Sequence, residues 1–188
     1  MNSDRHLTRV IDACSLLNLL ATGRAAEVLT VARCTLIMPR QAREESLFLA
    51  DGFDEKGKAL YSLVTTDALE REGLISYVDT SKLPPALLIQ CSERLTDVDA
   101  HVLALTLHRQ LPLISDDTRV RRTAAEFAPT LETCGICGLL RVVAVGAQWT
   151  ASEVADVLES MRSRARFAVP RGDDDGAWLA AAAGSGRR

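Results

Sequence analysis

Short apolar runs alternate with helix-like segments along most of this chain, and this alternation constrains the fold more than any other feature. The runs typical of buried strands are 8–11, 35–38, 74–78, 113–115 and 131–134. The segments typical of helices are 15–20, 24–33, 39–50, 58–70, 98–109, 119–127 and 136–145. Parallel strands need crossover connections, usually helices, so this order predicts a mainly parallel sheet with helices on both faces. The predicted fold class is α/β, a three-layer α/β/α sandwich.

The domain organisation follows from length and from a change in composition. With 188 residues the chain suits one domain better than two, and we expect that domain over 1–168. Thr150 and Glu153 have the spacing of a capping box and predict an amphipathic helix near its end. Residues 169–188 are rich in Arg, Gly, Asp and Ala and have few large apolar side chains, so we expect a flexible C-terminal tail.

Composition excludes several classes of protein. No apolar run approaches the roughly 18 residues of a membrane span, and the polar start lacks the apolar core of a secretion signal. The five cysteines are odd in number and mostly lie in apolar stretches, which favours reduced thiols and a cytoplasmic protein. Cys134 and Cys137 have the spacing of half a zinc site, but no second pair accompanies them, which favours buried packing.

Acidic residues follow two of the strand-like runs. Asp12 ends the first run, and Asp116 and Asp117 end the run at 113–115. The carboxyl ends of parallel strands share one edge of a sheet, where ligand sites gather, so we expect Asp12 and Asp117 to lie near one another. A single Asp after a strand is more often a helix cap or a turn residue, so each acid alone indicates little.

Two further acids lie close to helix starts. Glu44 comes about one and a half turns into the helix that follows 35–38, and Asp99 lies in the first turn of the helix at 98–109. Four carboxylates brought together repel one another unless a divalent cation neutralises them, and oxygen ligands of this kind favour Mg²⁺ or Mn²⁺. The three histidines have no zinc-ligand spacing with these acids, which disfavours zinc.

Four segments carry these acids in a recognisable order. They are Val10 to Leu20, Met38 to Glu45, Leu95 to Leu105 and Leu113 to Arg122. In order and context they resemble the motifs of the PIN-domain family, in particular its VapC-like members, the toxin ribonucleases of toxin–antitoxin pairs. The resemblance covers roughly 8–166.

The resemblance assigns a role to each acid. Asp12 takes the place of the first catalytic acid, and Asp99 fits the third better than the acid two residues before it. In the second motif Pro39 starts a helix, and counting about five positions on from it picks Glu44 as the second acid, although Glu45 competes with it. In the fourth motif Ser115 and Asp117 match the family pattern, and Asp116 is an auxiliary acid.

The activity that the resemblance implies is Mg²⁺- or Mn²⁺-dependent hydrolysis of single-stranded RNA, leaving a 5′-phosphate and a 3′-hydroxyl. Arg119, Arg121 and Arg122 follow the last acid and are placed to bind flanking phosphates, although a solvated helix face explains them equally well. The net charge of −3 means that RNA must be drawn to such a local patch.

The resemblance also implies partners: a cognate antitoxin protein of a type II toxin–antitoxin system, and a second copy in a homodimer. The alternative is a catalytically silent PIN-like module that binds RNA or protein and whose acids serve as helix caps.

Overall fold

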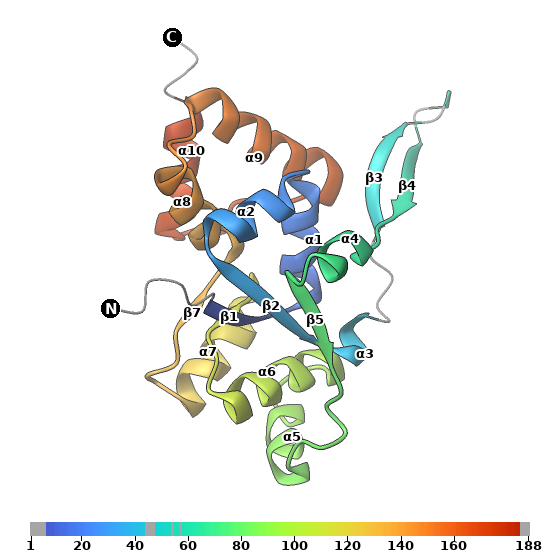
Figure 1. Ribbon diagram of the computed structural model, residues 1–188, viewed down its shortest axis with the longest axis vertical. Coiled ribbons are helices and arrows are strands. Elements are labelled where there is room, and N and C mark those ends of the chain that lie inside the picture. Colours follow the sequence, from blue (N-terminus) through green and yellow to red (C-terminus); the bar gives the residue numbers. More distant parts are fainter. Residues whose placement is uncertain (1–6, 44–47, 54, 57, 185–188) are drawn as a thin grey trace. The chain divides into compact units, whose positions relative to one another are not determined.

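The strand-like runs assemble into one parallel sheet of five strands in the order β5-β2-β1-β6-β7 (Figure 1). Each pair of neighbours is parallel. The strands are β1 (Leu7–Ile11), β2 (Cys34–Pro39), β5 (Ile75–Val78), β6 (Leu113–Ile114) and β7 (Thr133–Cys134). The predicted α/β class is confirmed, and a parallel sheet flanked by helices is consistent with the predicted three-layer sandwich.

The computed structural model describes residues 7–43, 48–53, 55–56 and 58–184. The chain forms two compact units, and neither is a continuous stretch of sequence. Unit 1 comprises Met1–Ser15, Arg33–Glu45 and Thr66–Gly135, and unit 2 comprises Leu16–Ala32, Ser46–Thr65 and Ile136–Arg188. The sequence predicted one domain over 1–168.

Unit 1 contains the parallel sheet and five helices. The helices are α3 (Arg40–Arg43), α4 (Asp67–Arg71), α5 (Pro85–Ser92), α6 (Asp97–Arg109) and α7 (Thr118–Phe127). α6 packs against β1 and β2, and α5 packs against α6. Its core is made of apolar side chains from these elements, including Val10, Val102, Leu103, Leu105, Leu113 and Val120.

Unit 2 is mainly helical. Its elements are most of α1 (Ala13–Ala21), which begins in unit 1, then α2 (Ala25–Val31), β3 (Phe48–Phe53), β4 (Ala59–Leu63), α8 (Ile136–Gly146), α9 (Ala151–Ala165) and α10 (Asp174–Gly184). Within this unit α9 contacts β3, and α2 contacts α8. Thr150 and Glu153 form the predicted capping box, so the start of α9 is confirmed.

An antiparallel hairpin, β3 and β4, replaces parts of the helices predicted at 39–50 and 58–70. Phe48 pairs with Leu63, and the next residue, Leu49, is buried. The run from Ala59 to Leu63 fits either periodicity, because its alanine and leucines favour a helix as readily as they fill a strand. Pairing with β3 therefore outweighed the local helix propensity of this run.

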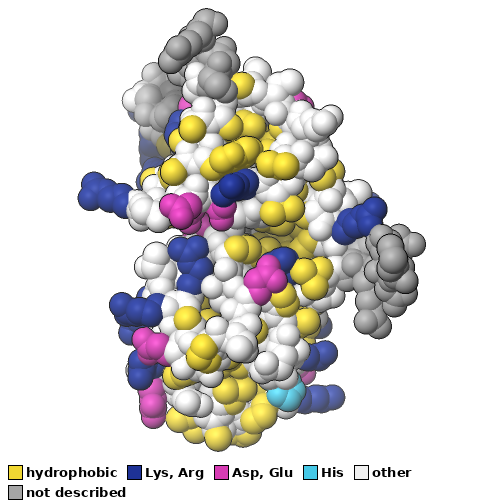
Figure 2. All heavy atoms as spheres, turned by 90° about the vertical axis from the view of Figure 1, so that its left-hand side faces the viewer, with side chains coloured by type: hydrophobic (Ala, Val, Ile, Leu, Met, Phe, Trp, Pro, Cys, Tyr) yellow, Lys and Arg dark blue, Asp and Glu magenta, His cyan; other side chains and the backbone are white. Residues whose placement is uncertain are grey.

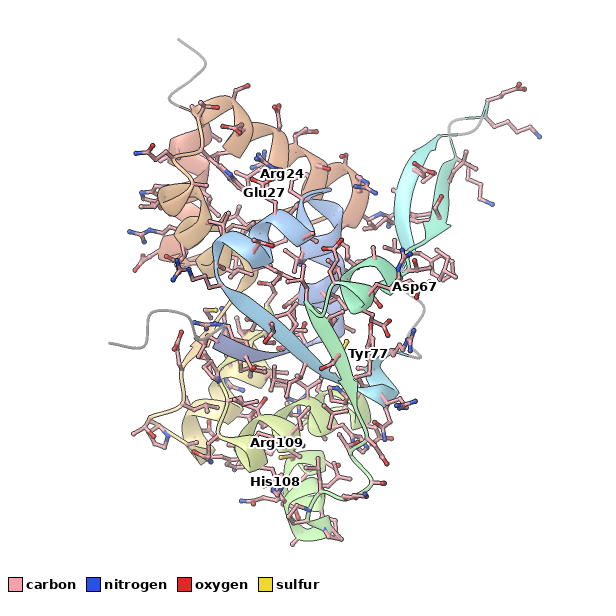
Figure 3. The ribbon with its side chains drawn as sticks, in the orientation of Figure 1. Arg24, Glu27, Asp67, Tyr77, His108 and Arg109 are labelled. Carbon is pink, nitrogen blue, oxygen red and sulfur yellow. The ribbon has the colours of Figure 1, made fainter. Side chains whose placement is uncertain are left out.

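A charged cluster in unit 2 joins the start of α2 to the segment between α8 and α9. Nε and Nη2 of Arg24 each donate to one oxygen of the Glu27 carboxylate at 2.6 Å (Figure 3). The guanidinium carbon lies 4.4 Å from the ring centre of Trp149. The indole nitrogen of Trp149 also donates to Glu27, at 3.3 Å. The hydrogen bond from Arg24 is the main reason that the pKa of Glu27 is lowered. These contacts connect the start of α2 to Trp149 and stabilise the packing within unit 2.

Much of the segment predicted as a flexible tail forms α10, which packs against α8 and α9. Leu179 is 1% exposed, and Arg141 of α8 binds Asp175 of α10 at 2.9 Å and lies over the ring of Trp178. These contacts hold α10 in place. Gly176 is buried, and a Cβ built there would lie 2.5 Å from a methyl of Val169. In the part of the chain that the structure describes, no helix is both long and apolar enough to cross a membrane.

Candidate active site at the carboxyl edge of the sheet

Asp12 is buried where β1 ends and α1 begins, with 4% of its surface exposed. Its backbone N–H donates to the carbonyl of Ile114 at 3.2 Å, which continues the parallel pairing of β1 with β6. Its Oδ1 accepts the backbone N–H of Ser15 at 2.6 Å, as a helix N-cap does. The end of β1 is thereby tied both to the next strand and to the helix that follows.

Two buried serines link this carboxylate to the residues that follow β6. The side chains of Ser15 and Ser115 both hydrogen-bond to Asp12. The oxygen of Ser15 accepts the backbone N–H of Asp116 at 2.8 Å, and that of Ser115 accepts the N–H of Asp117 at 3.2 Å. The structure therefore brings Asp12 together with Ser115, Asp116 and Asp117, as their positions at strand ends predicted.

Burial raises the pKa of Asp12 from 3.8 to about 6, because water no longer solvates the charged form. The hydrogen bonds from Ser115 and Ser15 oppose this rise, and the negative charge of Asp116 adds to it. A cation held beside this carboxylate would favour the ionised form. Asp12 is more deeply buried than Asp99, Asp116 and Asp117.

Asp117 is the N-cap of α7, and this is the capping role that the sequence left open. Its Oδ1 accepts the backbone N–H of Arg119 at 2.6 Å and that of Val120 at 3.4 Å. The residue is exposed. A carboxylate has two oxygens, and both of these bonds go to one of them, so capping and metal binding are compatible for this side chain.

Asp99 lies in the first turn of α6 and is half-buried. α6 leads back into β6, so it runs against the strand direction and its first turn lies towards the carboxyl edge. The bond recorded for its carboxylate comes from the hydroxyl of Thr96, at 2.6 Å, and not from the group around Asp12. Glu44 and Glu45, the two candidates for the second acid, lie outside the described residues.

The side-chain atoms around Asp12 that could bind a metal are all oxygens of carboxylates and hydroxyls, and such ligands fit a hard cation. Asp116 is near enough to Asp12 for its negative charge to raise the pKa of Asp12. Among residues 7–43, 48–53, 55–56 and 58–184, no three His, Cys, Asp or Glu side chains form a group that could hold a metal ion. Asp12, Asp99, Asp116 and Asp117 therefore do not form such a group by themselves, and Glu44 lies outside these ranges.

The three arginines proposed to bind substrate lie on α7, directly after Asp117. Arg119 and Arg122 are exposed, whereas Arg121 is half-buried. Burial is the main cause that raises the pKa of Cys134 in β7, and the positive charge of Arg121 is one of the effects that oppose it, so this arginine lies near β7. On the face drawn in Figure 2, basic and acidic side chains are interspersed with hydrophobic ones. Of these three arginines, Arg119 and Arg122 have the greater access to solvent.

A second polar group at the same edge was missed by sequence reasoning. Thr80 follows β5 and is 2% exposed. Its hydroxyl lies 2.8 Å from Oε1 of Gln41 in α3 and 2.8 Å from Nδ1 of His101 in α6. His101 was considered only as a zinc ligand. Its place two residues after Asp99, on a helix predicted to start at this edge, was the signal that was available.

Comparisons with protein-family models, with curated proteins and with solved structures gave no match to this chain. Its function has to be argued from the geometry of the site, because a fold class alone does not specify an activity. Two observations carry that argument: the buried Asp12 with its paired serines, and the polar side chains that other strands place along the same edge.

Proposed function

We propose that this protein is a Mg²⁺- or Mn²⁺-dependent endoribonuclease that hydrolyses phosphodiester bonds of single-stranded RNA at the carboxyl edge of its parallel sheet. The observation that carries the proposal is Asp12, a carboxylate buried at a strand end and oriented by Ser15 and Ser115. Burying a carboxylate is costly unless a partner compensates for it, and positions with this property cluster at functional sites.

Asp12, Asp99 and Asp117 are the proposed catalytic acids, with Glu44 as the fourth and Asp116 as an additional metal ligand. A bound Mg²⁺ or Mn²⁺ would supply activation of the attacking water and neutralisation of the charge that develops on the phosphate. The contribution of the chain is rigidity. Each serine accepts a backbone N–H from the β6 edge and contacts Asp12, so the first and last acids are held in one hydrogen-bonded frame.

The substrate phosphates that flank the cleaved bond would meet the start of α7. Arg119 and Arg122 expose their side chains there, next to Asp117, which is the N-cap of α7. Arg121 adds a third positive charge nearby. Ser115, which the sequence suggested as a substrate contact, is fully buried, so its proposed part is to hold Asp12 and the backbone of Asp117 in place.

The wider biology rests on the resemblance to the VapC-like ribonucleases. It suggests a toxin of a type II toxin–antitoxin system that acts in the cytoplasm, is held inactive by a cognate antitoxin and forms a homodimer. A nuclease of this kind would damage its own cell without such an inhibitor.

A second candidate is a catalytically silent module that binds RNA or protein. It is favoured by Asp117, whose carboxylate caps α7, and by Asp99, which holds the hydroxyl of Thr96. These contacts are those of structural acids.

An RNA cleavage assay separates the two candidates. A labelled single-stranded RNA is incubated with the purified protein in Mg²⁺, in Mn²⁺ and in EDTA, and the protein is compared with an Asp12→Asn, Asp117→Asn double variant. The matched control is Asp97→Asn, which changes an exposed acid in the first turn of α6. The nuclease predicts cleavage that is lost in EDTA and in the double variant and kept in the control. Cleavage by the double variant at the rate of the intact protein would overturn it.

A further inference from the structure

The proton positions around Thr80 follow from the chemistry of its two partners. The Oε1 of Gln41 can only accept, so the single hydroxyl proton of Thr80 is directed to it. The Thr80 oxygen can then only accept from His101, which means that Nδ1 of His101 carries a proton. In its neutral form the imidazole has one N–H, so Nε2 of His101 then presents a lone pair.

Thr80 and Gln41 follow the carboxyl ends of β5 and β2, so this network lies at the same edge of the sheet as Asp12. Gln41 follows β2, the strand paired with β1, and neighbouring strands lie about 5 Å apart. His101 lies on α6 two residues after Asp99, and its ring is half-buried, so part of it remains accessible. Because Nδ1 bonds to Thr80, Nε2 is the ring nitrogen that does not take part in the bonds to Thr80 and Gln41.

The structure therefore points to a specificity role. We propose that Nε2 of His101 accepts a hydrogen bond from a ribose 2′-hydroxyl of the bound strand, so that His101 distinguishes RNA from DNA, while Thr80 and Gln41 hold its ring as positioning residues. This inference rests on the proposed function, which places a nucleic-acid strand along the edge. It assigns the sugar as the group recognised.

The choice of the 2′-hydroxyl follows from donors and acceptors. Phosphate oxygens only accept hydrogen bonds, so an imidazole nitrogen with a lone pair gains nothing from them. The 2′-hydroxyl is the donor that every ribonucleotide backbone offers whatever its base, and it is the group by which proteins tell RNA from DNA. Aromatic residues make up only 4% of the chain, so a broad surface for stacking bases is not expected to replace this contact.

The test measures binding, so it does not depend on cleavage. One labelled sequence is prepared as RNA, as DNA and as 2′-O-methyl RNA, which keeps the oxygen but lacks the donor. Its affinity for the protein is measured by fluorescence anisotropy in EDTA and again in Ca²⁺. The variants are His101→Phe and Thr80→Val. The control is His108→Phe, which changes an exposed histidine two turns further along α6, labelled in Figure 3.

The intact protein and the His108 variant are expected to prefer RNA over both analogues. His101→Phe should reduce that preference about 2- to 10-fold, which corresponds to one neutral hydrogen bond, and Thr80→Val should change it in the same direction. An unchanged preference, or equal losses of affinity for all three strands, would show a structural role only and overturn the inference. Binding of no strand under either condition would overturn it as well. A retained preference without any cleavage in Mg²⁺ or Mn²⁺ would reject the nuclease and leave the role of His101 standing.

Discussion

Replacing Asp12 by Asn tests the cost of burying this carboxylate. Its pKa rises from 3.8 in an unstructured chain to about 6 in the fold, a difference of about two pH units. At about 1.4 kcal/mol per unit, this corresponds to about 3 kcal/mol. The sign follows from linkage: the folded protein keeps the proton to higher pH than the unfolded chain does. This stabilising contribution is therefore fully present below pH 3.8 and is lost as the pH rises through about 6.

Asn has nearly the shape of the protonated carboxyl group and cannot ionise. In EDTA at pH 8, Asp12→Asn should therefore be more stable than the intact protein by about 1 to 3 kcal/mol, the lower values allowing for weaker hydrogen bonds to Ser15 and Ser115. The advantage should shrink towards zero near pH 4. Urea unfolding followed by circular dichroism between these pH values measures it.

Adding Mg²⁺ or Mn²⁺ extends this measurement to the proposed metal site. A cation that binds only the folded state should stabilise the intact protein with rising concentration and have little effect on the variant. An Asn variant that is less stable than the intact protein at pH 8 in EDTA, or a difference that does not change with pH, would refute the reasoning about burial. Equal stabilisation of both proteins by the cation would refute the metal site while leaving that reasoning intact.

Three other substitutions test the packing described above, each by the free energy of unfolding in urea. Ser15→Ala removes the hydroxyl that accepts a backbone N–H from the β6 edge and should cost about 1 to 3 kcal/mol, whereas the exposed Ser92→Ala should change stability little. Thr150→Ala breaks the capping box of α9 and should cost about 1 kcal/mol; an unchanged midpoint would contradict that role. Gly176→Ala should destabilise by about 1 to 3 kcal/mol because the added methyl group meets a valine methyl at 2.5 Å, while Gly184→Ala, which meets nothing within 4 Å, should be neutral or stabilising.

The parallel sheet and the positions of Asp12 and Asp117 were predictable because they depend on short-range sequence patterns. Apolar runs between helical segments predicted the parallel sheet, and an acid directly after such a run must lie at its carboxyl edge. Asp12 and Asp117 were placed in this way, and their shared neighbourhood follows from the pairing of β1 with β6. The capping box of α9 was also predictable, because both of its residues lie in one helical turn.

Other features depend on contacts that no local pattern records. The run at 59–63 fits a strand and a helix equally, and its conformation is decided by pairing with β3. Ser15 reads as an ordinary helix residue until its hydroxyl is seen to accept from Asp116. Thr80 falls between the strand predicted at 74–78 and the helix predicted at 98–109, and its bonds to Gln41 and His101 span 39 and 21 residues.

The hydrogen bond between Ser15 and Asp116 joins residues 101 positions apart, and this separation bears on how the protein is made. During synthesis β1 leaves the ribosome early, but the residues that complete the frame of Asp12 are translated only after more than half of the chain. Contacts of such long sequence separation form late and slowly, because a long loop must close first. A nascent or truncated chain that stops before β6 would carry Asp12 without its partners, and the proposed nuclease would stay inert until the residues that follow β6 had been made.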